Sequence, residues 1–340
     1  MSRFSKFIIL LTAIVVVVPV IYWQERARDV IDIRLAHGLD QQHPVHLALV
    51  FMDKRLQDIS GGQMRLDIFP AGQLGSEREI IELIQIGTLG MTKVSASSLE
   101  PFVPEMKVFS LPYLFNDHDH YWKVLESDLG QQLLDSGSRY RVKGLGYFDA
   151  GSRSFYTTSK KVEKPSDLNG LKIRVMNSQS AVNMVNTIGG AATPVSWGEL
   201  YTALQQGIVQ GAENNPPSFY YSKHYEVSKF YLLDEHTSIP DVIIVGTHLW
   251  DSLSTQQQDW LQQAMHEATQ YQKKIWAEST QMSLQKVAEA GVTILQADKA
   301  IFQQSVQPIY RAIRDENINS LIQKIKLIGE DVDAITSNHE

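Results

Sequence analysis

The sequence predicts an α/β fold, and three observations support this class. The chain has 340 residues, of which 43% are hydrophobic and 20% charged, a composition typical of globular proteins rather than disordered or fibrous ones. This length is sufficient for two packed domains. From residue 31 onward, short segments of alternating hydrophobicity are followed by segments with helical spacing. Such alternation is typical of layered proteins whose strands are mainly parallel.

The first strand–helix–strand unit is predicted between residues 31 and 72. Residues 31–35 alternate with a period of two, which predicts a strand. Residues 43–59 carry one hydrophobic stripe and end at two glycines, which predicts a helix. Residues 64–69 predict a second strand, closed by a proline and a glycine.

Two tetrapeptides mark predicted helix starts further along the chain. Residues 76–79 (Ser-Glu-Arg-Glu) and 196–199 (Ser-Trp-Gly-Glu) both have the Ser-x-x-Glu spacing of a capping box. We expect a helix after each box. Strands are predicted between them at 142–148, 152–157 and 171–175.

The segment 254–290 contains neither glycine nor proline, and its hydrophobic residues recur at helical spacing. A continuous helix of roughly 37 residues would be about 55 Å long, which exceeds the diameter of a small domain. We therefore expect a helix that lies along two domains and joins them. The alternative is two helices with a break near Ser279.

The N-terminus has the pattern of an export segment. An apolar run of about 17 residues follows Arg3 and Lys6 and precedes a charged stretch, which indicates that the rest of the chain is exported. The run is short for a membrane span, and no small-x-small cleavage site follows it. Residues 1–29 are therefore expected to be a cleaved signal peptide or an N-terminal anchor.

Composition and motifs argue against several functions. The absence of cysteine excludes disulfides, thiol catalysis and cysteine-ligated metals. A net charge of −7 argues against a nucleic-acid partner. No phosphate-binding loop or nucleophile elbow is present, and a zinc-protease pattern that begins at His266 fails at Gln270. We expect no catalytic residue, no metal and no cofactor.

The polar residues that are hardest to explain as surface lie between positions 150 and 241. Arg153 and Arg174 lie in predicted strands, and Asn214 comes just before a diproline that would hold its amide rigidly. A guanidinium binds a carboxylate through two parallel hydrogen bonds, and an amide suits the recognition of hydroxyls. Taken singly, the arginines also fit a solvated strand, and the asparagine fits a turn.

The combination of five segments resembles the extracytoplasmic solute-binding proteins of TRAP (tripartite ATP-independent periplasmic) transporters. The segments are 75–79, 151–155, 167–175, 199–214 and 224–229. The resemblance covers residues 30–330, and 199–214 is its most specific part. It implies an α/β periplasmic-binding-protein-like fold (type II), with two lobes, a hinge and a long helix that spans both. The expected lobes are 30–150 with 240–280, and 151–239 with 281–340.

The resemblance also implies a role for the candidate residues. The carboxylate-clamping arginine of the family falls on Arg174, the second conserved-motif arginine on Arg153, and the cleft asparagine on Asn214. The implied protein is a periplasmic monomer that captures an organic acid in the cleft and delivers it to the membrane permease of the transporter.

The substrate class follows from the segment 213–226, which is similar to family members that bind sugar acids such as glucuronate and galacturonate. A polyhydroxylated acid needs further polar groups. The candidates are Asn177, Glu79, His37, Gln42, His43, Ser97 and Asp241. Glu79 and His43 also have a purely structural explanation as helix-capping residues.

Three alternatives remain open. A C4-dicarboxylate or a keto acid would use the same arginines. An exported sugar-acid enzyme that uses His37 and Glu79 would turn its ligand over, whereas a binding protein returns the ligand unchanged. A sensor for a membrane signalling partner would be favoured by an uncleaved anchor.

Overall fold

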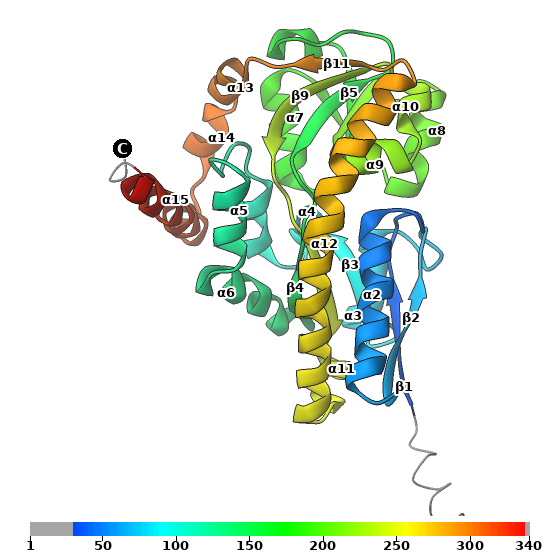
Figure 1. Cartoon of the computed structure of the whole chain (residues 1–340). Coiled ribbons are helices and arrows are strands. Elements are labelled where there is room, and N and C mark those ends of the chain that lie inside the picture. The colour runs from blue at the N-terminus through cyan, green and yellow to red at the C-terminus, as the bar shows by residue number, and fades with distance from the viewer. Residues whose placement is uncertain (1–29, 337–340) are drawn as a thin grey trace, which may run out of the picture.

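The computed structural model describes residues 30–336 as two mixed sheets, each covered by helices, with one long helix running across both (Figure 1). The α/β fold class is confirmed. The predicted signal peptide or anchor, residues 1–29, lies outside the described residues. Between residues 30 and 336, no helix has the length and hydropathy that a membrane span requires.

The first sheet has the strand order β2-β1-β3-β10-β4. β1 runs parallel to β2 and β3, whereas β10 runs antiparallel to β3 and β4. We call this sheet and its helices lobe I. Its elements are β1 (Ile31–Ala36), α2 (Pro44–Ile59), β2 (Met64–Phe69), α3 (Glu77–Gln85), β3 (Met91–Ser95), α4 (Ala96–Leu99), η1 (Pro104–Ser110), α5 (His118–Leu125), α6 (Asp128–Ser136), η2 (Gly137–Tyr140), β4 (Val142–Phe148), β10 (Asp241–Gly246) and α11 (Thr247–Ser252).

The second sheet has the strand order β11-β9-β5-β8-β6-β7. β6 is parallel to β7 and β8, and β5 is antiparallel to β8 and β9. We call this sheet and its helices lobe II. Its elements are β5 (Arg153–Thr157), η3 (Pro165–Leu168), β6 (Lys172–Val175), α7 (Gln179–Ile188), β7 (Ala191–Pro194), η4 (Trp197–Glu199), α8 (Leu200–Gln205), β8 (Gly211–Asn214), α9 (Pro216–Tyr221), α10 (His224–Val227), β9 (Phe230–Thr237), β11 (Thr293–Gln296), α13 (Lys299–Ser305) and α14 (Gln307–Ala312).

The expected joining helix is present as a single element, α12 (Thr255–Glu289), without a break at Ser279. Ala264 and Ala268 of its first half pack in the core of lobe I, where small side chains allow α12 to lie against α2. Val287 near its end packs in the core of lobe II. Figure 1 shows α12 passing α2 and then α9 along its length.

Two short crossings also connect the lobes, because β4 leads into β5 and β9 leads into β10. Asp149, at the first crossing, is buried. Its side chain accepts a hydrogen bond from Trp122 at 3.2 Å and lies 2.7 Å from the His118 ring nitrogen. The Gln272 side chain of α12 bonds both the backbone N–H and the carbonyl of Asp149 at 2.8 Å. These contacts attach the crossing to lobe I and to α12.

The last helix, α15 (Glu316–Thr336), corrects the expected lobe boundaries. Residues 281–340 were expected in lobe II, and β11 and α13 do lie there. However, Ile318, Ile322 and Ile325 of α15 pack in the core of lobe I, and the His120 ring bonds the Ile325 carbonyl at 2.8 Å. The expected assignment is wrong for α15, because its apolar stripe is buried against η1 and α5 of lobe I.

Candidate functional site

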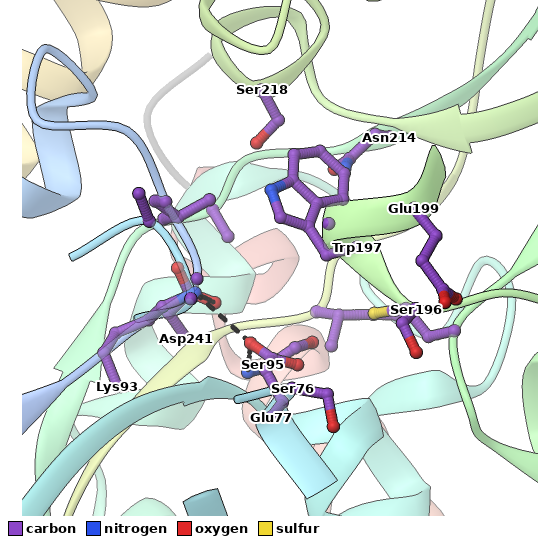
Figure 2. Close-up of a pocket in the computed structure, with 18 of the residues that line it drawn as sticks. Ser76, Glu77, Lys93, Ser95, Ser196, Trp197, Glu199, Asn214, Ser218 and Asp241 are labelled. Carbon is purple, nitrogen blue, oxygen red and sulfur yellow. Dashed lines mark hydrogen bonds and ion pairs between the residues drawn. The ribbon is translucent and has the colours of Figure 1, made fainter. Parts of the chain in front are cut away.

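A cavity of about 420 Å³ lies between the two lobes, and residues from both lobes line it. The lobe I wall is formed by the start of α3, by residues of β3 and β10, and by the loops that follow β1 and β2. The lobe II wall consists of residues of β5, β6 and β8, with η4 and the start of α9. Figure 2 shows Lys93 and Asp241 across this cavity from Trp197 and Asn214.

Arg174 is the uncompensated cation of the lobe II wall. β6 buries this side chain, which is 3% exposed. Its Nε donates to the Val195 carbonyl at 2.8 Å, and its guanidinium lies 5.7 Å from the Trp197 ring centre. Nη1 is buried without a hydrogen-bond partner, and no ion pair joins Arg174 to a described residue. Burial lowers the pKa of Arg174. A carboxylate in the cavity would supply the missing partner.

Arg153 is also buried in the lobe II wall, but its charge is already paired. Its Nε and Nη2 bond the two carboxylate oxygens of Glu213 at 2.5 and 2.9 Å, and Nη2 also bonds the Glu213 carbonyl at 2.8 Å. Nη1 donates to Asn214 Oδ1 at 2.8 Å. These bonds use four of the five guanidinium N–H groups. Arg153 therefore has one N–H left to offer to a ligand.

The Arg153–Glu213 pair continues into a buried histidine. His236 Nε2 lies 3.5 Å from Glu213, and His236 Nδ1 lies 2.8 Å from Asp234. Burial opposes the charge on His236, but Asp234 and Glu213 raise its pKa to about 9. Burial likewise opposes the charge on Glu213, but Arg153 lowers the pKa of this carboxyl to about 2. Two cations and two anions thus balance within this network.

Asn214 ends β8 between the two arginines. Its Oδ1 accepts from Arg153 Nη1 and from the Asn215 backbone N–H at 2.8 and 2.9 Å. The hydroxyl of Tyr231 donates to the Asn214 carbonyl at 2.8 Å. Because Oδ1 is occupied, the amide nitrogen is the group that remains to donate to a ligand in the cavity.

The lobe I wall carries a buried lysine between two carboxylates. Lys93 lies in β3, all of whose residues are buried. Its Nζ lies 3.2 Å from Asp241 and 3.5 Å from Glu77. Burial raises the pKa of Asp241, against the lowering effect of Lys93. Glu77 also accepts from the Ser95 backbone N–H at 3.2 Å, so the wall is rigid as well as charged.

The capping box at Ser76 is confirmed, and it places Glu79 at the cavity. The Glu79 carboxylate accepts from the Ser76 N–H and hydroxyl, both at 2.8 Å, and Glu79 also lines the cavity. These hydrogen bonds lower the pKa of Glu79. Glu79 therefore both takes part in the capping box of α3 and lines the cavity.

The structure brings together some of the candidate site residues and separates the others. Arg153, Arg174, Asn214, Glu79 and Asp241 line the cavity. The other five candidates do not line it. Asn177 lines a smaller adjoining hollow of about 130 Å³. Gln42 is exposed beside Asp40, whereas Ser97 is buried with its hydroxyl 3.1 Å from that of Ser110. His37 and His43 lie behind the wall, buried in the protein.

Backbone hydrogen bonds fix both buried histidines as neutral rings. His37 Nδ1 accepts from the Leu39 N–H at 3.1 Å, so its proton is on Nε2, 3.0 Å from His46. His43 Nδ1 accepts from the Val45 N–H at 3.3 Å, and its Nε2 lies 3.3 Å from the hydroxyl of Ser218. His43 thus caps α2, as its structural explanation required, and it also orients Ser218, which lines the cavity.

We expect the free energy of unfolding to fall as the pH is lowered from about 6.5 toward 3. Burial, with the nearby charge of Lys93, lowers the pKa of His37 to about 3 in the folded protein. In the unfolded chain this ring takes up a proton near pH 6.5, so the unfolded state binds more protons in this window. The loss approaches about 1.4 kcal/mol per pH unit for one such histidine.

Urea unfolding at pH 7, 6, 5 and 4 measures this dependence. His37→Gln should make the decline less steep by the share of this one ring, because glutamine does not titrate, whereas His224, whose pKa burial also lowers to about 3, remains. A decline of unchanged steepness in this variant would show that His37 is not its source.

Sequence reasoning missed several cavity residues. The sequence pattern does not single out Lys93 and Glu77 as site residues, although a lysine in a strand of otherwise core-like residues is a signal that a buried partner exists. Residues 196–199 were expected to form a capping box, and that expectation is wrong. Ser196 makes no side-chain cap bond, and the segment is the short 3-10 helix η4, with α8 beginning at Leu200. This leaves Ser196 and Trp197 to line the cavity.

A cavity between two α/β lobes, with a buried cation on one wall that pairs with no described carboxylate, is the architecture of a two-lobed solute-binding protein. The chain belongs to the bacterial extracellular solute-binding proteins, family 7, whose family model matches residues 35–317. The resemblance seen in the sequence is therefore confirmed.

Solved structures of similar proteins have the same fold. A TRAP periplasmic solute-binding protein from Bradyrhizobium sp., in complex with galacturonate, is 38% identical with a TM-score of 0.84, covering 86% of this chain and 99% of that chain. Another from Anaerococcus prevotii, with bound D-glucuronate, is 32% identical with a TM-score of 0.86, covering 88% and 99%. An uncharacterised protein of Salmonella typhimurium is 36% identical over 86% of this chain and 90% of its own. The expected two-lobed fold is confirmed.

Proposed function

We propose that this protein binds a uronate, such as D-galacturonate or D-glucuronate, in the cavity between its lobes. The observation that carries the proposal is the buried Arg174 guanidinium, whose Nη1 has no partner and which has no ion pair with a described residue. A buried guanidinium without a carboxylate is costly, and a ligand carboxylate removes that cost. The uronates bound by the two solved relatives support the same class of ligand.

The remaining cavity residues suit the hydroxyl groups of such a ligand. Asn214 and Arg153 each have one donor group left, beside Arg174 on lobe II. On lobe I, the Asp241 and Glu77 carboxylates offer acceptors. A uronate would therefore bridge the two lobes, with its carboxylate on lobe II and hydroxyls on lobe I. Such bridging favours the closed arrangement of the lobes.

In this proposal the protein is exported to the periplasm, acts as a monomer, and delivers the acid to a TRAP membrane permease. It breaks no bond in the ligand and needs no cofactor. Membership of the solute-binding family supports this role. The rival enzyme function would require His37 beside the ligand, but His37 lies behind the cavity wall with both ring nitrogens engaged.

A thermal-shift and calorimetry experiment on residues 30–340 tests the proposal. D-Galacturonate and D-glucuronate should stabilise the protein by about 2.7 kcal/mol at a hundredfold excess over the dissociation constant. D-Galactose and D-glucose, which have the same ring hydroxyls without the carboxylate, should give no shift. Equal shifts with the neutral sugars, or none with either acid, would overturn the proposal. Ligand recovered unchanged after release, by NMR, would distinguish binding from turnover.

A further inference from the structure

The charges on the lobe I wall do not balance. Lys93 is the one cation that lines this wall in the part of the chain the structure describes, whereas Glu77, Glu79 and Asp241 all line it. Lys93 and Asp241 are both buried, and Glu77 is partly buried. Even with Asp241 protonated, two glutamates would face one lysine. The wall therefore carries a net negative charge, with Lys93, Asp241 and Glu77 buried or partly buried and Glu79 exposed.

Hydrogen bonding makes the same wall a set of acceptors. The Lys93 ammonium has three N–H donors, and two of them are directed to Asp241 and Glu77. Asp241 Oδ1 receives Lys93, and the other carboxylate oxygen, Oδ2, has no hydrogen bond within the described residues. Hydroxyl groups can donate to such oxygens, but a carboxylate cannot. The wall thus suits a ligand end that carries hydroxyls.

The two walls of the cavity differ in the sign of their charge and in how that charge is paired. Arg174 on lobe II is an unpaired cation that faces the cavity. Lys93 on lobe I is paired twice, within a cluster whose carboxylates outnumber it. Burial, with the additional charge of Glu77, also raises the pKa of Asp241 despite Lys93, as expected where negative charge is in excess.

We propose that the cluster Lys93–Asp241–Glu77, with Glu79, restricts this site to acids with a single carboxylate and rejects dicarboxylates. The proposal rests on the proposed function, in which Arg174 holds the ligand carboxylate. A second carboxylate at the far end of the ligand would meet buried like charges and no free cation. Juxtaposed like charges at an interface cost several kcal/mol, so we expect a preference of roughly 100-fold or more.

Matched ligand pairs test the proposal by calorimetry on the wild-type protein. Galactarate has the carbon chain of D-galacturonate with C1 oxidised to a second carboxylate, and D-glucarate is related to D-glucuronate in the same way. Because this oxidation also opens the pyranose ring, D-galactonate and D-gluconate, which are open-chain acids with one carboxylate, are the controls for loss of the ring. We expect each uronate to bind about 100-fold more tightly than its dicarboxylate. Dicarboxylates that bind as tightly as the uronates would overturn this inference and leave the uronate proposal standing. Binding of neither ligand would overturn both.

Two variants assign the preference to the cluster. Asp241→Asn removes one charge from the wall and should reduce the uronate-to-dicarboxylate ratio by about tenfold or more. Glu79→Gln, which preserves the capping box because glutamine also fits that position, should reduce it less, because Glu79 is exposed. Glu79→Gln also keeps the test available if Asp241→Asn fails to fold.

Glu82→Gln is the matched control. Glu82 lies on α3 with Glu77 and Glu79, but it is exposed and pairs with Arg78 away from the cavity. This variant should leave both the uronate affinity and the ratio unchanged. A ratio that stays at the wild-type value in Asp241→Asn and Glu79→Gln would show that the cluster does not set the preference.

Discussion

Replacing Arg174 by methionine is expected to weaken D-galacturonate binding by roughly 1000-fold while leaving the protein at least as stable as its parent. A charge pair that loses one partner in a buried site costs about 3–5 kcal/mol, which corresponds to this change in affinity. Stability should not fall, because Arg174 has a buried, unpartnered Nη1 and no ion pair with a described residue in the structure. Calorimetry and urea unfolding measure the two effects separately.

Arg174→Lys is the matched control for geometry. Lysine retains the positive charge but not the planar pair of donors, so we expect an affinity between those of the parent and Arg174→Met. If Arg174→Met bound the uronate as tightly as the parent, the assignment of the carboxylate to this residue would be wrong.

Replacing Arg153 by methionine should reduce the stability of the protein more than its affinity for the ligand. Glu213 would keep its buried charge and lose its closest cation, so the free energy of unfolding should fall by about 3–5 kcal/mol. Affinity should change less than in Arg174→Met, because Arg153 has one N–H left for a ligand. Urea unfolding without ligand measures the stability of the variant.

A double-mutant cycle identifies the cause. Glu213→Gln removes the charge that Arg153 balances, so Arg153→Met should cost much less in that background than in the parent. If the losses of stability in the two single variants add up to the loss in the double variant, the Arg153–Glu213 pair is not the source of the stability. The two arginines look equivalent in sequence, and this pair of experiments separates their roles.

The sequence was informative wherever a feature depends on neighbouring residues. The helix 254–290 was predicted because nothing within it breaks a helix, and the box at Ser76 because its two partners are three residues apart. The box at Ser196 has the same spacing but is not formed, because that segment turns toward the cavity instead. The position of α15 depends on contacts with η1 and α5, which lie about 200 residues earlier in the chain, and no local pattern contains them.

The site was less predictable because it is assembled from distant strands. Lys93 and Asp241 lie on neighbouring antiparallel strands, with Asp241 opposite Ser95 and Lys93 opposite Ile243. Residues two apart on one strand share a face, so this register places the two charges together. No local pattern contains that pairing. His37 and His43 do not line the cavity for a related reason, since their rings accept hydrogen bonds from backbone N–H groups two residues further along the chain, in the loop after β1 and in the first turn of α2.

The attachment of both lobes to α12 has a consequence for the entropy of binding. Four separate passages of chain link the lobes: the two crossings, α12, and the segment between α14 of lobe II and α15 of lobe I. Such links leave few of the six relative degrees of freedom of the two bodies. Most of the translational and rotational freedom that two independent bodies would lose on docking has therefore been lost on folding. A small ligand has only to restrict the relative motion that remains.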